Sequence, residues 1–335
     1  MWLTMKRKVI KQGHNTLTMT LPRHWVEKLN LAAGDEIDIQ ERESTLVING
    51  PQHTKEKKAE IDLRGLTIPI IWRYFQSAYR AGCDEIKVVF DPNKMYEDAF
   101  SCYTTQFPYS KLGEKIPLKP AIAVVLEVVN RFIGIEVIES SESYCIIKEM
   151  GEPSKKEFEH SLRRIFLVLL QLFDRVIDAV EKNEHNDIAL CKELHAIDTH
   201  IDKFVDYCVR ILNKIADSYP EDKKYLMFSS LFMLELVGDE FKYIGKHLAF
   251  AKKIDKEVPV LARLVKSHFE LYYNLFFKFE RETASMLGTN DSLLYQTHSK
   301  MREKMHGDDR SLMRHFMTIS KFVLALVELR IEMEF

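Results

Sequence analysis

The sequence lacks the cysteine pattern of a disulfide framework or a thiolate zinc site. Its 5 cysteines are scattered, odd in number and without C-x-x-C spacing, which argues against both. It also lacks any apolar run of about 18 residues or more, and its first residues do not show the charge order and apolar centre of a signal peptide. We therefore expect a cytoplasmic protein without membrane insertion.

The sequence also lacks an excess of charge of one sign. The formal net charge is −2 over 335 residues, so the chain as a whole is neither a basic nucleic-acid binder nor an acidic tail. Any nucleic-acid site must be local. With 46% hydrophobic residues the chain can bury a sizeable core, and its length predicts about two domains or a little more.

The amino-terminal segment alternates as short strands. Gly13 and Asn15 supply the positive φ that a tight hairpin turn needs, and Pro22 suits the start of a short helix. The expected strands are 8–12, 16–21, 36–40 and 45–49, with a helix at 23–29. So small a unit cannot bury much surface alone, and we expect it to pair with a copy of itself.

Charge is polarised within this unit. Lys6, Arg7, Lys8 and Lys11 bring four positive charges together. The second hairpin is acidic, with Asp35, Glu36, Asp38, Glu41 and Glu43. The basic strand can be read as a solvated edge that discourages aggregation, or as a local nucleic-acid site.

The order of these elements resembles the AbrB/SpoVT family of swapped-hairpin DNA-binding domains, also found in MazE-type antitoxins. The matching stretches are Arg7-Lys-Val-Ile-Lys11, Gly13, Asn15, Leu21-Pro-Arg23 and Leu31-Ala-Ala-Gly-Asp35. In that family two chains interlock and their basic strands lie on DNA. The resemblance implies a homodimer whose DNA contacts are Arg7, Lys8, Lys11, Asn15 and Arg23. Lysine and arginine would bind phosphates, whereas Asn15 and Arg23 are able to read base edges.

The middle segment predicts a small α/β module. After the lysine-rich 55–58, expected helices are 68–81 and 120–132, expected strands are 85–90, 133–138 and 144–148, and 91–118 is irregular. The segment contains no Gly-rich phosphate loop and no nucleophile with a partnered base. We interpret it as a spacer or dimerisation element.

From Ser154 onward the apolar residues recur with the helical period, and Gly and Pro almost vanish inside the segments. Six helices are expected, at about 154–183, 187–218, 222–253, 256–286, 290–306 and 309–334. The connections between them are short. Neighbouring helices should therefore run antiparallel.

Two of these helices carry pairs of acidic residues one turn apart: Asp198 with Asp202, and Glu235 with Asp239. Like charges so placed cost about 0.2–0.5 kcal/mol per pair. The apolar stripes predict that all four carboxylates lie on the outer side of the helices. A solvated acidic face is then the default interpretation, and a site for a hard or borderline metal ion is the alternative. His195 and His200 would be surface partners.

This region resembles the PhoU family of phosphate-uptake regulators, which consist of two three-helix repeats. The most specific stretch is Leu234-Glu-Leu-Val-Gly-Asp239, with Asp198 to Asp202 as its companion. The resemblance implies a transition-metal cluster, such as iron, zinc or nickel, held by Asp198, Asp202, Glu235 and Asp239. In the second repeat Met317 and Lys321 occupy the corresponding positions, so one site is expected rather than two.

The expected architecture is multidomain. Residues 1–52 form a small swapped-hairpin β domain, 53–152 an α/β linker domain, and 153–335 an all-α six-helix bundle of two three-helix repeats. The combination resembles archaeal PhoU-like proteins.

The resemblances together imply a dimeric, DNA-binding transcriptional regulator of phosphate uptake with a metal-binding sensor bundle. The alternative is a cytoplasmic adaptor that docks on the ATPase of the phosphate ABC transporter without binding DNA. An antitoxin is suggested by the amino terminus alone. An enzyme is not expected, because carboxylate pairs on a convex helical surface lack the enclosed pocket of acid–base catalysis.

Overall fold

The computed structural model describes residues 5–13, 16–42, 45–49, 56–97, 118–215 and 219–335. Contacts between Cα atoms divide the chain into two compact units, Met1–Lys55 and Glu56–Phe335. The second unit contains both the expected α/β module and the expected helices.

The first unit consists of two hairpins and a short helix. Strand β1 (Ile10–Gln12) pairs antiparallel with β2 (Thr16–Thr18), and β3 (Asp38–Arg42) pairs with β4 (Thr45–Asn49). Helix α1 (Arg23–Lys28) follows Pro22, which is its N-cap. The expected order of hairpin, helix and hairpin is confirmed.

Apolar side chains of this unit lie open to solvent. Val9, Ile10, Leu17, Ile39 and Leu46 are each more than half exposed, at 63%, 55%, 70%, 59% and 59%. Among the side chains of this unit whose placement the structure describes, none is buried within the single chain. A unit without a core of its own needs a partner surface to be stable.

The α/β module of the second unit is built on a four-stranded sheet in the order β5-β6-β10-β9. Its strands are β5 (Lys58–Asp62), β6 (Glu85–Val89), β9 (Ile135–Ser140) and β10 (Tyr144–Glu149). β5 runs parallel to β6, and the remaining pairs are antiparallel. β5 extends the sheet beyond the expected strands: its first residue lies in the stretch that the sequence indicated as a linker.

Two helices complete this module. Helix α2 (Ile68–Arg80) connects the parallel strands β5 and β6, and α4 (Ala121–Val129) follows the short pair β7 (Met95–Glu97) and β8 (Leu118–Pro120). The ring of Phe132 stacks on Trp72 and Tyr79 at centroid distances of 5.1 and 4.5 Å. These contacts join the end of α4 to α2 and close the core of the module.

Six long helices follow. They are α5 (Lys155–Glu181), α6 (Ile188–Lys214), α7 (Lys224–Phe250), α8 (Val258–Phe277), α9 (Arg281–Arg302) and α10 (Gly307–Glu332). Ser154 and Glu157 form a capping box at the start of α5, which stabilises that end.

The expected boundary between the fourth and fifth helices was wrong. Helix α8 ends at Phe277, because the backbone of Lys278 is extended. Gly288 lies inside α9 rather than before it. One glycine costs only about 1 kcal/mol within a helix. Packing of Leu287 and Leu294, which are buried on α9, offsets that cost.

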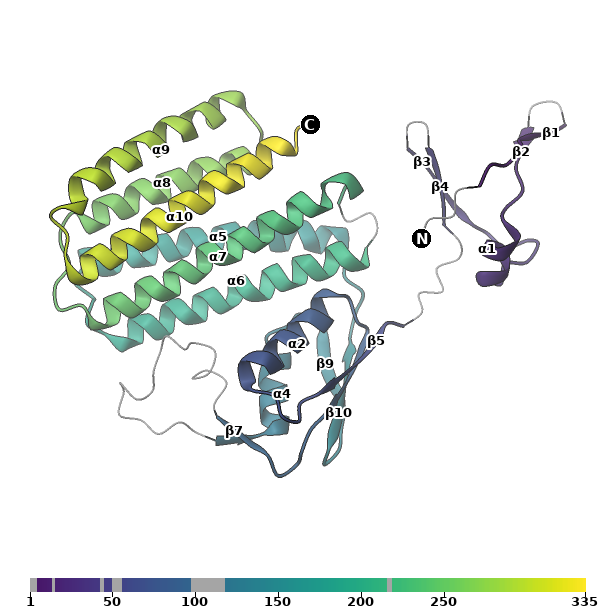
Figure 1. The fold of residues 1–335 in the computed structure, drawn as a ribbon, viewed down its shortest axis with the longest axis horizontal. Helices are drawn as coiled ribbons and strands as arrows, with labels where there is room; N and C mark the ends of the chain where they lie inside the picture. Colours follow the sequence, from purple (N-terminus) through teal and green to yellow (C-terminus); the bar gives the residue numbers. More distant parts are fainter. Residues whose placement is uncertain (1–4, 14–15, 43–44, 50–55, 98–117, 216–218) are drawn as a thin grey trace. The chain divides into compact units, whose positions relative to one another are not determined.

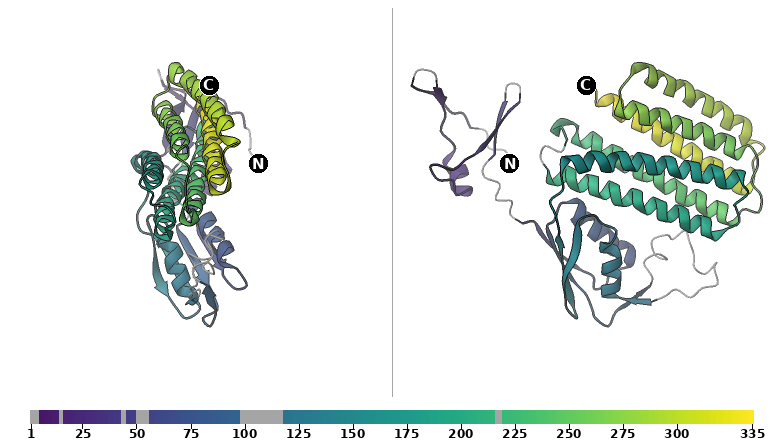
Figure 2. Two further views of the ribbon diagram at one scale, coloured as in Figure 1. Left: turned by 90° about the vertical axis from the view of Figure 1, so that its left-hand side faces the viewer. Right: turned by 180° about the vertical axis from the view of Figure 1, so that it is seen from behind.

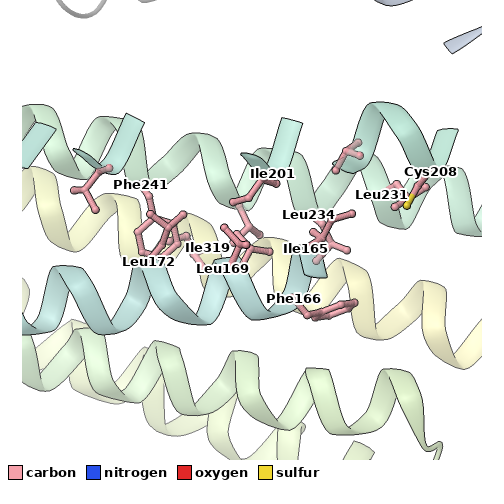
Figure 3. Close-up of a cluster of buried hydrophobic side chains, with 14 of the residues drawn as sticks. Ile165, Phe166, Leu169, Leu172, Ile201, Cys208, Leu231, Leu234, Phe241 and Ile319 are labelled. Carbon is pink, nitrogen blue, oxygen red and sulfur yellow. The ribbon is translucent and has the colours of Figure 1, made fainter. Parts of the chain in front are cut away.

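The helices pack as two sets of three. α5, α6 and α7 contact one another, as do α8, α9 and α10, and the sets join where α5 meets α8 and α7 meets α10. Buried side chains from α5, α6, α7 and α10 interlock in the core, among them Phe166, Ile201, Leu234, Phe241 and Ile319 (Figure 3). Among the described residues, no helix is long and apolar enough to cross a membrane.

The α/β module packs along α6, with α2 beside that helix (Figures 1 and 2). Arg210 of α6 is 1% exposed and donates to the carbonyls of Tyr79 (2.8 Å) and Cys83 (2.9 Å) and to Glu149 Oε1 (2.9 Å). Lys214, one turn further, pairs with Asp84 (2.5 Å) and with Glu149. Hydrogen bonds and ion pairs with little exposure to solvent therefore join the module to the helices.

Replacing Arg210 by methionine should lower the free energy of unfolding by about 3 kcal/mol, because it leaves Glu149 and two carbonyls poorly paired in a buried place. The free energy of unfolding is measured by urea titration, with circular dichroism as the signal. Arg175→Met is the matched control: its guanidinium pairs with Glu184 and Glu193 at a more open site and should contribute less than about 1 kcal/mol. Equal losses in the two variants would contradict the role of Arg210.

Candidate metal centre

A stripe of charged residues runs along one face of α6. Asp198, Asp202, Asp206, Arg210 and Lys214 follow one another at four-residue spacing, which places them one above the next on a helix. Asp198, Asp206 and Arg210 are buried. The stripe thus faces neighbouring elements along much of its length.

Helix α7 brings two further carboxylates, Glu235 and Asp239, against this stripe. We call Asp198, Asp202, Asp206, Glu235 and Asp239 the acidic cluster. Gly238 allows the two helices to approach closely: a Cβ there would lie 2.8 Å from Asp198 Oδ1 and 3.0 Å from Ile201 Cδ1. Any larger residue would displace the Asp198 carboxylate or the Ile201 side chain.

Helix α2 covers one end of the acidic cluster. Arg80 donates to Asp206 Oδ1 (2.5 Å) and Glu235 Oε2 (3.1 Å), and Gln76 donates to Asp206 Oδ1 (3.1 Å). The prediction that the carboxylates lie on the outer surface was wrong. Asp198 is fully buried, and the side chains of Glu235 and Asp239 are 19% and 34% exposed. The helical period identified the face away from the bundle core, but that face is covered at Glu235 by the α/β module.

Lys242 lies within the cluster itself, one turn after Asp239. Its Nζ is 2.9 Å from Asp198 Oδ2 and also contacts Asp239 Oδ1. Burial lowers the pKa of Lys242, but the carboxylates of Asp198, Asp202 and Asp239 outweigh it, and the net pKa is raised. The ammonium is therefore charged at neutral pH and supplies one positive charge between the helices.

Four carboxylates of the cluster bind protons more readily than they would in water. Burial raises the pKa of Asp198 well above its usual range, with repulsion from Asp202 adding to it and Lys242 opposing it. Burial likewise raises the pKa of Asp202 to about 7, and raises the pKa of Asp206 and Glu235 despite Arg80. Burial of these carboxyl groups thus favours their protonated forms.

His195, one turn before Asp198, is buried, contrary to the expected surface position, whereas His200 is exposed. Burial, together with the charges of Lys242 and Arg131, lowers the pKa of His195 to about 4. The imidazole is therefore neutral at physiological pH, the form in which histidine can bind a metal.

Three carboxylates fit a single cation. Oxygens of Asp198, Asp202 and Asp239 lie within 4.8 Å of one another, about the span of opposite oxygen ligands on a divalent ion. Asp198 Oδ1 and Asp202 Oδ1 are buried and accept no hydrogen bond from the described residues, whereas Asp198 Oδ2 lies 2.9 Å from the Lys242 ammonium. An all-oxygen set suits a hard or borderline ion, which would have to displace the Lys242 ammonium. Glu235, the fourth expected ligand, is held by Arg80 instead.

The corresponding part of the second helical set carries no such group. Met317 of α10 is buried and Lys321 is exposed. Within the described residues, the one set of three or more possible ligands that lies close enough together is Asp198, Asp202 and Asp239.

The residues expected to contact DNA lie in the first unit. Arg7, Lys8, Lys11 and Arg23 are exposed, and Arg23 pairs with Glu27 on α1 (2.7 Å). Asn15 lies outside the described residues. The structure therefore presents four of these five side chains to solvent.

Sequence reasoning missed four residues of the site: Asp206, Lys242, Gln76 and Arg80. Asp206 could have been found, because it continues the four-residue spacing of Asp198 and Asp202 toward Arg210 and Lys214. The contact of Arg80 joins residues 126 positions apart in the chain. No local sequence pattern predicts such a contact.

Comparison with known families matched the amino-terminal part of the chain. The family model described as antidote-toxin recognition MazE, bacterial antitoxin, matches residues 10–60. This match supports the expected AbrB/SpoVT-like domain at the amino terminus. Searches of curated proteins and of solved structures each gave no match to the chain.

Stability of the chelator-treated protein should fall as pH rises from about 4 to 7. Folding raises the pKa of Asp202 from 3.8 to about 7, so over that range the folded state binds a proton that the unfolded state has lost. The free energy of unfolding should decrease by about 1–3 kcal/mol, measured by urea titration at several pH values. Asp202→Asn should flatten this dependence. If the free energy of unfolding of Asp202→Asn depended on pH as strongly as that of the parent, the raised pKa of Asp202 would be contradicted.

Proposed function

We propose that the chain is a DNA-binding regulator whose first unit contacts DNA as a dimer. The observation that carries this proposal is the MazE match over residues 10–60, since a domain of this type suggests a DNA-binding regulator. The exposed Arg7, Lys8 and Lys11 lie in or just before β1 within that unit. Cations so grouped bind the phosphate backbone and set affinity without reading sequence.

Dimerisation through the first unit is supported by its exposed apolar side chains. Val9, Ile10 and Leu17 belong to the first hairpin and Ile39 and Leu46 to the second. Burying such residues stabilises by about 25 cal/mol per Å² of apolar surface. A second copy of the unit would present the same apolar residues and cover them, as the AbrB/SpoVT resemblance implies.

We further propose that the helices are a PhoU-like sensor linked to phosphate uptake, with a divalent cation held by Asp198, Asp202 and Asp239. Two packed sets of three helices support this reading. So do the buried Oδ1 atoms of Asp198 and Asp202, which accept no hydrogen bond from the described residues. The cation would supply positive charge between α6 and α7, the role that Lys242 fills in the structure. The proposal assigns no catalytic activity.

Removing charge from the first hairpin should weaken DNA binding. In gel shifts with genomic promoter fragments, Arg7→Ala combined with Lys11→Ala should weaken binding and reduce the salt slope by about 2, because each phosphate contact contributes about −0.9 to it. The control removes two exposed arginines of the second unit, Arg73→Ala with Arg164→Ala, and should bind as the parent does. Unchanged binding in the Arg7/Lys11 variant would contradict the assignment of these residues as DNA contacts. It would favour the alternative of an adaptor that does not bind DNA.

Metal binding should depend on both the carboxylates and Lys242. Calorimetric titration with Mn²⁺, Fe²⁺ or Zn²⁺ should show one site per chain that Asp239→Asn weakens by about tenfold or more. Lys242→Met should bind more tightly, since it removes the competing ammonium. The control Asp174→Asn changes an exposed carboxylate on α5 and should have no effect. No uptake by either the parent or the Lys242 variant would refute the metal site.

A further inference from the structure

A cleft lined by cations lies between α9 and α10, away from the acidic cluster. Its volume is about 490 Å³, within the range of small-molecule sites. Five basic side chains line it: His298, Arg302, Arg310, Arg314 and Lys321. No carboxylate is among its lining residues.

The cations of this cleft are not neutralised by the surrounding chain. Arg302, Arg310, Arg314 and Lys321 form no ion pair with any carboxylate of the described residues. Glu303, which follows Arg302, is not among the lining residues, and Asp308 and Asp309, which directly precede Arg310, are engaged elsewhere. Asp308 Oδ1 lies 3.3 Å from His247 Nδ1, and Asp309 Oδ1 accepts from the backbone N–H of Asp255 at 3.0 Å.

The positions of the cations follow from helix geometry. Arg310 and Arg314 are one turn apart on α10, Lys321 lies two turns beyond Arg314 on the same face, and His298 and Arg302 are one turn apart on the facing helix α9. The hydroxyls of Ser311 and Thr318 line the cleft between them. Both hydroxyls donate to backbone carbonyls of α10, those of Gly307 and Arg314. The guanidinium groups are the donors suited to phosphate oxygens.

The electrostatics of His298 agree with this arrangement. Burial lowers the pKa of His298, and the charges of Arg302 and Lys321 lower it further. The cleft therefore has a positive potential that disfavours another proton and attracts an anion.

We propose that this cleft binds a small polyanion carrying two or more phosphate groups. Four unneutralised cations exceed what a single phosphate needs, and a concave site of this volume admits a compact oligophosphate or a nucleotide. A duplex would lie across the opening instead of entering it. The inference stands apart from the proposed function, since it uses neither DNA nor the acidic cluster.

The test is calorimetric titration of the full chain, in a buffer free of phosphate, with orthophosphate, pyrophosphate and ATP. Pyrophosphate and ATP should bind at one site per chain, and orthophosphate at least about tenfold more weakly. Equal affinities for pyrophosphate and ATP show that the cleft recognises phosphates alone. Tighter binding of ATP shows that it also contacts the nucleoside.

The decisive variant is Arg314→Ala with Lys321→Ala, which should weaken pyrophosphate binding about 100-fold. Both side chains are exposed, so the fold should persist, and circular dichroism verifies it. Arg314→Lys should retain most of the affinity, and Arg164→Ala, an exposed arginine of α5 outside the cleft, all of it. Absence of binding by all three probes would overturn the proposal. So would equal binding in the double variant, or a double variant that loses affinity only for duplex DNA.

Discussion

The second unit depends on the neutralisation of carboxylates placed between two closely packed helices. Asp198, Asp202 and Asp206 face Glu235 and Asp239 across a contact that Gly238 makes very short. Buried like charges are costly unless cations and protons balance them. Arg80, Lys242 and raised carboxyl pKa values together provide that balance.

This requirement explains why the α/β module belongs to the same compact unit as the helices. Arg80 is the last residue of α2, and its guanidinium joins Asp206 to Glu235. Further along α6, Arg210 and Lys214 reverse the pattern, because there the helix supplies cations and the module supplies Glu149 and Asp84. Each side of the interface thus supplies cations that pair with carboxylates of the other side. A module interpreted from sequence as a spacer is thus part of the environment of the acidic cluster.

Most of the secondary structure could be predicted from the sequence, because it is set by local patterns. The hairpin around Gly13, the helix from Ile68 and the long helices after Ser154 follow from turn residues, apolar periodicity and capping. The burial of Asp198 could not be predicted in this way. The helical period states which side of α6 faces the bundle core, but neither that Gly238 and Lys242 of α7 pack against Asp198 nor that α2, more than 100 positions earlier in the chain, covers Asp206. The break at Lys278 was missed because no glycine or proline marks it.

Gly238 has a consequence for how the acidic cluster can exchange its positive charge. The ends of the Asp198 and Ile201 side chains lie where a Cβ of residue 238 would otherwise be. The absence of a side chain there leaves room for the Asp198 carboxylate beside those of Asp202 and Asp239, whose oxygens lie within 4.8 Å of one another. Exchange of an ammonium for another cation would require rotation of the Lys242 side chain alone, with the helix backbones left in place.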